Sequence, residues 1–227
     1  IGNLMNFFEE IDIMEHIVFV EASTSGAGYQ AIKYAKKIGA YVTLFTHKKK
    51  KYANDTEEGD LLPLTDNIIE TETIDNDIVC QMVLELHQEF PITAITTVSD
   101  YFVPIAANAA TILGLPSISY KAALQCRNKY LMRLCLDKIC PELNPEYQII
   151  YHSDQLCLEV NPTKPIVIKP TDENDSYNVY MTNCEEYARR HVNKLKATTI
   201  SREGKTLFPA VLAERYIAGQ EYSVEIY

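Results

Sequence analysis

The amino-acid sequence predicts an α/β unit over residues 16–120, followed by an α+β unit over residues 121–227. In the first part, apolar runs rich in β-branched residues alternate with segments of helical periodicity, which is typical of a parallel sheet with right-handed crossovers. In the second part, short strand-like runs follow one another closely, which favours antiparallel pairing. We therefore expect a Rossmann-like domain joined to a domain with a different sheet, with residues 1–15 as a lead-in segment.

Each element of the first unit has its own signal. The segment after the first strand has apolar residues at helical spacing and ends at Gly39, a helix stop signal. Asp75 or Asp77 is suited to cap the next helix, and the third helix has Pro104 in its first turn and Gly114 near its end. The expected strands are residues 16–22, 41–46, 67–74 and 92–98, and the expected helices are residues 28–40, 75–90 and 102–114.

The second unit is predicted to begin with one long helix, residues 122–140. Short runs rich in β-branched and aromatic residues then indicate strands. The expected strands are residues 146–152, 165–170, 177–181, 210–217 and 221–227, with a helix over residues 183–198.

Composition excludes several classes of function. The net charge of −10 argues against nonspecific nucleic-acid binding, and the one basic cluster, "HKKKKY" at residues 47–52, is interpreted as a solvated loop. No apolar run approaches the roughly 18 residues of a membrane span, and the first residues do not resemble a signal peptide. The six cysteines form no C-x-x-C pair, so we expect reduced thiols and a cytoplasmic protein.

The stretch "STSGAGYQA" satisfies G-x-G-x-x-A between a strand and a helix through Gly26, Gly28 and Ala31. This arrangement directs backbone N–H groups toward an anion. A dinucleotide site would also need an acidic residue at the end of the second strand, where a threonine and a histidine stand instead, so NAD binding is disfavoured. Two interpretations remain, a structural tight turn or a loop that contacts an anionic substrate through Ser25 and Gly26.

Ser99 and Asp100 follow the fourth predicted strand, in "TTVSDYF". Ligands of open α/β sheets bind along the carboxyl edge where these residues should lie. Serine and aspartate are also preferred helix caps. Both roles, substrate contact and cap, are open at this point.

Three further motifs carry charge in the second unit. "RNKYLMR" places Arg127, Lys129 and Arg133 within two helical turns, which a solvated helix face would also explain. Lys169 ends an apolar strand, so its ammonium is held in place and suits phosphate oxygens, although an edge-strand lysine is the alternative. "VLAERYIAGQEYSVEIY" leads to Glu221, whose carboxylate could accept from two ribose hydroxyls unless the segment is a plain hairpin.

Taken in this order, the motifs resemble the ATP-grasp superfamily of carboxylate–amine ligases. "ALQCRNKYLMRLCLDKICPELNPEY" is similar to its helix with a phosphate-binding lysine, "PIVIKPTDENDSYNVY" to its second lysine strand and phosphate loop, and "VLAERYIAGQEYSVE" to its adenine-binding linker and ribose-binding glutamate. "TTVSDYFVPIAANAATILGLP" resembles amino-acid and peptide ligases in particular. The resemblance covers nearly the whole chain from His16 onward and implies a pre-ATP-grasp domain followed by the first part of an ATP-grasp domain.

The resemblance implies that Lys129 and Lys169 contact ATP phosphates and that Ser176 lies near the β- and γ-phosphates. The phosphate loop of the family carries glycine where this chain has Asp175 and Asn178. Asparagine tolerates left-handed backbone angles. A carboxylate beside phosphates is repulsive by roughly 1–4 kcal/mol at about 4 Å, unless Mg²⁺ offsets it or the side chain turns outward.

The resemblance also implies a set of residues for the nucleoside and the metal. Glu221 would bind the ribose hydroxyls, and the Mg²⁺ ligands are expected downstream of Tyr227, with none in this chain. No residue is assigned a catalytic role. The residues expected to hold adenine, mostly through their backbone, are Glu214, Arg215, Tyr216 and Ile217.

The implied function is an ATP-dependent ligase that joins an amino acid, peptide or related small acid to an amine through an acylphosphate, with release of ADP and phosphate. The cofactors would be ATP and Mg²⁺, the partners small molecules, and the assembly a homodimer as in many relatives. The alternative is a nucleotide-binding or interaction protein that kept the fold and lost catalysis. We expect the chain to be the N-terminal portion of a longer enzyme and inactive alone, with a naturally shortened relative as the other possibility.

Overall fold

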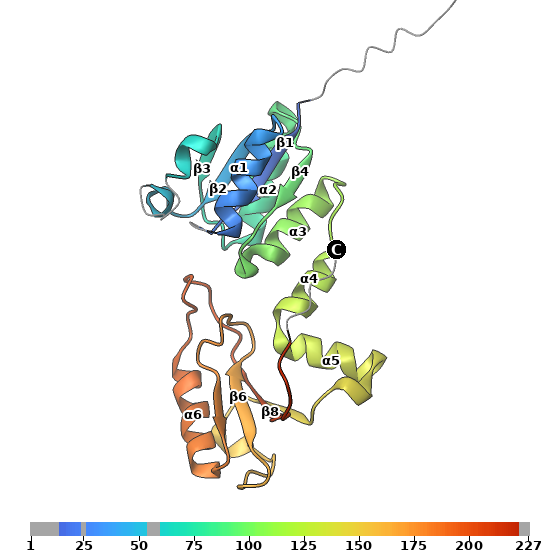
Figure 1. The fold of residues 1–227 in the computed structure, drawn as a ribbon, viewed down its shortest axis with the longest axis vertical. Coiled ribbons are helices and arrows are strands. Elements are labelled where there is room, and N and C mark those ends of the chain that lie inside the picture. The colour runs from blue at the N-terminus through green and yellow to red at the C-terminus, as the bar shows by residue number, and fades with distance from the viewer. Residues whose placement is uncertain (1–13, 24–25, 54–59, 223–227) are drawn as a thin grey trace, which may run out of the picture. The chain divides into compact units, whose positions relative to one another are not determined.

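The computed structural model describes residues 14–23, 26–53 and 60–222. The chain divides into two compact units, Ile1–Tyr120 and Lys121–Tyr227, which we describe separately (Figure 1). Three sequence expectations lie outside the described residues: the lead-in segment before Met14, Ser25, and the predicted final strand beyond Tyr222.

The first unit contains a four-stranded parallel sheet in the order β3-β2-β1-β4. Its strands lie within the predicted runs, which confirms the expected parallel α/β sheet. The strands are β1 (His16–Val20), β2 (Tyr41–Thr46), β3 (Asn67–Glu70) and β4 (Ala94–Thr96). The helices are α1 (Ala27–Lys37), α2 (Asn76–Glu89) and α3 (Val103–Ile112), with short 3₁₀ turns η1 (Lys49–Tyr52), η2 (Leu62–Leu64) and η3 (Asp100–Phe102).

The sheet of the first unit is covered on both faces. Val18 and Phe45 pack with residues of α2 and α3, such as Val83. On the other face, Leu44 packs with Ile32 of α1, and Figure 1 shows these helices flanking the strands. Burial on both faces explains why the strands are continuous apolar runs rather than alternating ones.

Helix boundaries follow local capping chemistry. Of the two predicted caps for α2, Asp75 is the one used, because its side chain accepts from the backbone N–H groups of Asp77 and Ile78. The single helix predicted for residues 122–140 is wrong. Asn128 has an extended backbone and caps a second helix, so the segment forms α4 (Tyr120–Arg127) and α5 (Lys129–Ile139).

The second unit contains a four-stranded antiparallel sheet in the order β5-β8-β6-β7, as the closely spaced strands predicted. The strands are β5 (Tyr147–Ile150), β6 (Ile166–Pro170), β7 (Tyr180–Thr182) and β8 (Val211–Arg215). The remaining elements are α6 (Glu185–Ala197) and the 3₁₀ turns η4 (Pro141–Leu143) and η5 (Ser153–Gln155).

Strand alternation decides which side chains face the core of the second unit. Ile166 and Ile168 of β6 are buried with Val192 of α6. Val167 and Lys169 alternate with them and are only partly buried, so they lie on the face away from α6. Lys169, the last residue of β6 but one, is therefore carried by a strand and excluded from the apolar core.

No helix in the part of the chain that the structure describes has the length and apolarity needed to cross a bilayer. The six cysteines, all within that part, are free of disulfides.

Candidate functional site

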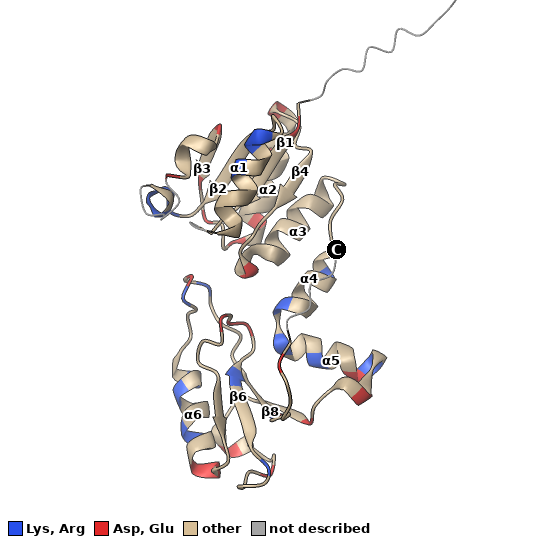
Figure 2. Cartoon of the chain, viewed as in Figure 1, with Lys and Arg blue, Asp and Glu red and all other residues tan. Residues whose placement is uncertain are grey.

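A pocket of about 260 Å³ lies in the second unit, where the end of β6 meets the start of α5 and the loop before β7. Figure 2 shows basic residues both at the start of α5 and on β6. The residues that line the pocket are Lys129, Lys169, Pro170, Glu173, Asn174, Asp175, Ser176, Tyr177 and Val179. The structure thus brings together the two predicted phosphate-binding lysines and the serine of the predicted phosphate loop.

Lys169 is held by a buried carboxylate. Its Nζ lies 2.6 Å from Oε2 of Glu214, which β8 presents beside β6 because Glu214 pairs with Val167 in the antiparallel register. Arg133 of α5 donates from Nε to the other carboxylate oxygen at 2.8 Å. One carboxylate therefore faces two cations, which leaves a positive charge beside the pocket.

Glu214 is charged despite being only 5% exposed. Burial by itself would raise its pKa, but the hydrogen bonds from Arg133 and Lys169 outweigh burial and lower the pKa. An ammonium has three donors, so the bond to Glu214 fixes the direction of Lys169 and leaves donors for a ligand.

Lys129 stands at the first position of α5, where the break at Asn128 places it. Its backbone N–H donates to Thr171 O at 2.8 Å, and its Nζ donates to Glu173 O at 2.5 Å. Burial lowers the pKa of Lys129, and the neighbouring charges of Arg127 and Lys169 lower it further. Cations this close repel one another, so an anion in the pocket would relieve the repulsion.

The loop between β6 and β7 contains no glycine, but part of its backbone adopts dihedral angles that glycine usually has. Asp175, Ser176 and Asn178 have φ values of 50°, 54° and 60°, in the left-handed region that glycine usually occupies. The two positions where the resemblance led us to expect glycine are thus both left-handed. Asn178 thus uses the tolerance of asparagine for left-handed angles. Because the loop extends to Asn178, β7 begins at Tyr180, later than the predicted strand of residues 177–181.

Asp175 is paired with a cation that the sequence reasoning missed. Its Oδ2 lies 2.8 Å from Nη2 of Arg202. Arg202 belongs to a tight turn between α6 and β8, and no motif pointed to it, since the contact joins segments distant in the sequence. The predicted repulsion toward phosphates is therefore reduced by a neighbouring guanidinium within the chain.

The residues expected to hold the nucleoside are not in the described lining of the pocket. Arg215 donates through Nε to Glu146 at 3.1 Å, and the backbone N–H of Tyr216 donates to Pro165 O. Ile217 and Glu221 are exposed. Their nucleoside contacts remain predictions, whereas the side chain of Glu214 has the additional role of holding Lys169.

In the first unit, the predicted glycine turn is a close-packed structure. Gly26 has φ 58° and ψ −128°, a conformation restricted to glycine. The N–H of Gly28 donates to Ser23 Oγ at 3.0 Å, and a Cβ at this position would lie 2.4 Å from that oxygen. These contacts favour the structural interpretation of the turn.

Ser99 and Asp100 lie just after β4, at the carboxyl edge of the parallel sheet. Ser99 precedes η3, but its side chain makes no capping hydrogen bond, so of the two open roles serine does not take that of a cap. Asp100 is exposed in the first turn of η3. Their role as substrate contacts remains a prediction.

Sequence reasoning also missed Glu21, a fully buried carboxylate that directly follows β1. It accepts from Thr73 Oγ1 at 2.7 Å, from the backbone N–H of His47 at 2.7 Å, from Thr46 Oγ1 at 3.1 Å, and from the hydroxyl of Tyr52. Burial would raise its pKa, but these hydrogen bonds lower it. An acid after an apolar run is the only signal that the sequence offered.

Within the described residues, no group of three or more histidine, cysteine, aspartate or glutamate side chains is arranged to hold a metal ion. The two lysines and the loop that line the pocket supply chemistry for an anionic ligand.

Comparison with known proteins shows which proteins share this fold. Residues 32–117 match the model of the ATP-grasp N-terminal domain. Of the solved structures, L-amino acid ligase from Bacillus licheniformis matches with a TM-score of 0.66 and 20% identity, over 90% of this chain and 45% of that one. N5-carboxyaminoimidazole synthetase from Staphylococcus aureus, complexed with ADP, matches with a TM-score of 0.60 and 14% identity, over 89% and 48%. A comparison with curated proteins found no match.

The chain is similar to ATP-grasp proteins in its fold. Residues 32–117 correspond to the ATP-grasp N-terminal domain, and the chain has the fold of the solved ATP-grasp ligases over 90% and 89% of its length. The fold expected from the resemblance is thereby confirmed. The chain spans about half the length of these solved structures, 45% and 48% of the two described above.

Proposed function

We propose that the pocket between Lys129 and Lys169 binds the phosphates of ATP, and that the complete protein is a carboxylate–amine ligase. The observation that carries this proposal is the convergence of both lysines and a left-handed loop on one pocket. Proteins with the same fold, from Staphylococcus aureus and Aspergillus clavatus, are complexed with ADP and ATP respectively. The L-amino acid ligase from Bacillus licheniformis supports an amino acid as a substrate class.

In this proposal, the charged and polar residues named for the nucleotide have separate roles. Lys129 and Lys169 neutralise phosphate charge, and Glu214 keeps Lys169 directed toward the pocket. Ser176 offers a hydroxyl close to the terminal phosphates. The adenine is held by the segment that begins at Glu214, and the ribose by Glu221.

The reaction that fits this site transfers the γ-phosphoryl group of ATP to a substrate carboxylate, which gives ADP and an acylphosphate. The amine then attacks the acyl carbon and displaces phosphate. Positioned cations contribute by aligning the phosphoryl group and stabilising its charge, so no protein nucleophile is needed. Mg²⁺ would supply further charge neutralisation.

The proposed carboxylate substrate would contact the carboxyl edge of the first sheet. Gly26, Ser99 and Asp100 are the candidates, together with Ser25, which lies outside the described residues. A cytoplasmic location and a homodimeric assembly are part of the same proposal.

The decisive experiment measures ADP and phosphate release by the complete protein with Mg²⁺, ATP and a panel of amino acids and amines. We expect turnover only when both substrates are present. Lys169→Ala should reduce turnover by at least about 100-fold, the loss typical when an electrostatic donor is removed. The matched control is Lys164→Ala, because Lys164 precedes the same strand and pairs with the exposed Glu159. Turnover that survives Lys169→Ala would show that the role given to Lys169 is wrong.

A second candidate is a nucleotide-binding protein without ligase activity. The glycine-free loop, tied to Arg202 through Asp175, favours it. ATP binding that depends on Lys129 and Lys169, without ADP formation for any substrate pair, would select this candidate over the ligase.

A further inference from the structure

We propose that Arg202 is a positioning residue for the nucleotide pocket: it holds the glycine-free loop in its left-handed shape and neutralises Asp175. This inference rests on the proposed function, because it concerns the same pocket. Arg202 is not among the described lining residues, so it would act through the loop and not by touching the nucleotide.

Arg202 contacts several pocket-lining residues of the loop. Its Nη2 lies 2.8 Å from Asp175 Oδ2 and 2.6 Å from Asn174 Oδ1. Its guanidinium stands 4.8 Å from the ring centroid of Tyr177, and its backbone N–H donates to Glu173 Oε1 at 3.3 Å. A planar guanidinium can bond to two oxygens and stack on a ring at once, so a single side chain organises the loop.

The turn that carries Arg202 is itself well defined. Ile200 and Thr206 form an antiparallel bridge, and the N–H of Ser201 donates to Lys205 O at 2.8 Å. Gly204 has φ 84°, a value that suits glycine at a tight turn. Because these bonds close the turn, the backbone of Arg202 is held in place and its side chain extends from a defined position.

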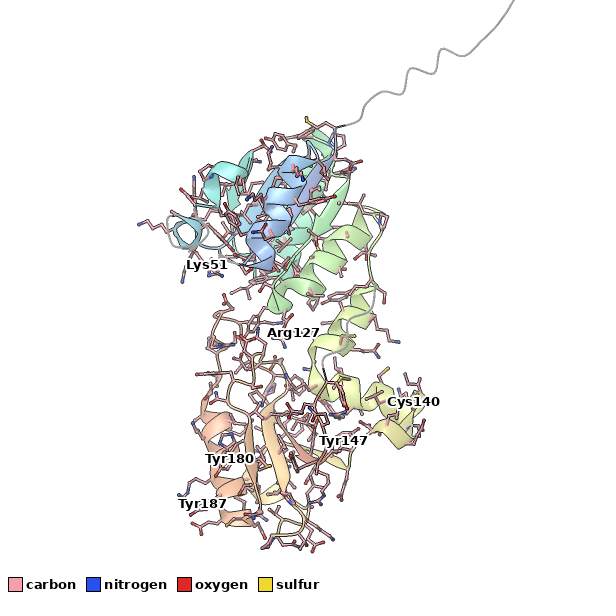
Figure 3. All side chains as sticks on the ribbon, viewed as in Figure 1. Lys51, Arg127, Cys140, Tyr147, Tyr180 and Tyr187 are labelled. Carbon is pink, nitrogen blue, oxygen red and sulfur yellow. The ribbon has the colours of Figure 1, made fainter. Side chains whose placement is uncertain are left out.

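The beginning of the loop is held independently by cations at the junction of α4 and α5. Arg127 (labelled in Figure 3) donates from Nη2 to Asp172 O at 2.6 Å, and Lys129 donates to Glu173 O. These bonds fix the residues before Asn174. The left-handed residues Asp175, Ser176 and Asn178 follow Asn174. Glycine would adopt this conformation without strain, whereas in this loop the contacts of Arg202 hold it.

Arg202 also affects nucleotide binding through its charge. Asp175 lines the pocket, and its carboxylate would repel phosphates if it were unpaired. Pairing with Arg202 offsets part of that charge. Loss of Arg202 would therefore both loosen the loop and expose a negative charge to the nucleotide.

The two effects can be separated by measuring ATP affinity calorimetrically on the complete protein. Arg202→Ala should weaken ATP binding by about tenfold, within the range of coupling between contacting residues. Arg202→Ala combined with Asp175→Asn should recover part of that loss, because it removes the exposed charge but does not restore the hold on the loop, and Asp175→Asn alone should bind ATP at least as tightly as wild type. Arg202→Lys should fall between wild type and alanine, because an ammonium cannot stack and bond to both oxygens in the same way.

Arg190→Ala is the matched control, since Arg190 pairs with Glu186 on the surface of α6 at 70% side-chain exposure. It should leave ATP affinity unchanged. Hydrogen exchange of residues 171–179 without nucleotide gives a second readout, and we expect faster exchange in Arg202→Ala than in Arg190→Ala.

Unchanged or tighter ATP binding in Arg202→Ala would overturn the inference, as would a double variant that binds no better than Arg202→Ala. Failure of the proposed function looks different: ATP affinity would then be absent in wild type or insensitive to Lys129→Ala and Lys169→Ala. In that case unchanged exchange of the loop in Arg202→Ala would still overturn the holding role of Arg202.

Discussion

The ammonium of Lys169 and the carboxylate of Glu214 lie 2.6 Å apart on neighbouring antiparallel strands. Glu214 also binds Arg133, so α5, β6 and β8 meet at one carboxylate. The consequence is a lysine whose direction is set before any ligand arrives. Such preorganisation reduces the entropy that binding would otherwise cost.

Glu214→Gln should destabilise the second unit. Glutamine keeps the shape but removes the charge, so Arg133 and Lys169 would remain close together without a counter-charge. We expect the free energy of unfolding to fall by about 3 kcal/mol, as when one partner of a largely buried ion pair is removed. Urea unfolding at pH 7 measures this loss. Glu186→Gln on the exposed face of α6 is the control, and a loss no larger than its small effect would count against the buried cluster.

Glu21 should make the first unit sensitive to acid. Its pKa in the folded state lies below the ordinary value of 4.5, so the charged form stabilises the fold at neutral pH. That contribution is lost as the pH falls from about 4.5 through the lower folded pKa. At pH 7, Glu21→Gln should cost about 2 kcal/mol, the order of hydrogen bonds to a charged group.

The measurement is urea unfolding of wild type and Glu21→Gln between pH 7 and pH 3. The difference in unfolding free energy between the two proteins should shrink as the pH falls. Asp66 and Glu214 also have lowered pKa values, and comparing the two proteins at each pH removes their contributions. A difference that stays constant down to pH 3 would refute the role given to Glu21.

Gly28→Ala should strain the turn before α1. The new Cβ would lie 2.4 Å from Ser23 Oγ and 2.5 Å from Ser23 O, so the backbone must move. We expect a loss of roughly 1–3 kcal/mol in unfolding free energy. Gly219→Ala is the control because its Cβ would meet open space, and equal losses in the two variants would contradict the close approach.

Asp175→Gly and Asn178→Gly should each change the unfolding free energy by no more than about 1 kcal/mol. Both residues already have positive φ, so relief of backbone strain offsets the extra entropy of glycine in the unfolded chain. Asn178→Val should instead lose stability, because a β-branched residue is a poor fit to left-handed angles. Urea unfolding of the three variants tests this order, and valine as stable as glycine at position 178 would contradict the loop geometry.

The sequence predicted the strands and helices well because each depends on local periodicity. The apolar run of β2 and the alternation of β6 both report which faces are buried, and the alternation also left Lys169 outside the core. The break at Asn128 was missed because the apolar period continues through it, while a capping side chain decides the boundary. The missed break matters for the site, because a single helix over this segment does not show that Lys129 is the first residue of α5.

The sequence motifs pointed to the charged residues of the candidate pocket. They did not reveal which residues form ion pairs with them. Lys129, Lys169 and Ser176 converge on one pocket as the order of the motifs indicated. The contacts Lys169–Glu214 and Asp175–Arg202 join residues 45 and 27 positions apart (214 − 169 and 202 − 175). Such pairs depend on strand register and on the path of a turn, which local patterns do not encode.

Glu21 joins the strand ends of the first unit in a way that bears on how this sheet opens. The residue follows β1, accepts from Thr46 at the end of β2, and accepts from Thr73 shortly after β3. Three neighbouring strand ends thus share one anchor. Loss of that anchor would free all three together, so the amide protons along this edge should exchange with solvent as a single cooperative unit rather than strand by strand.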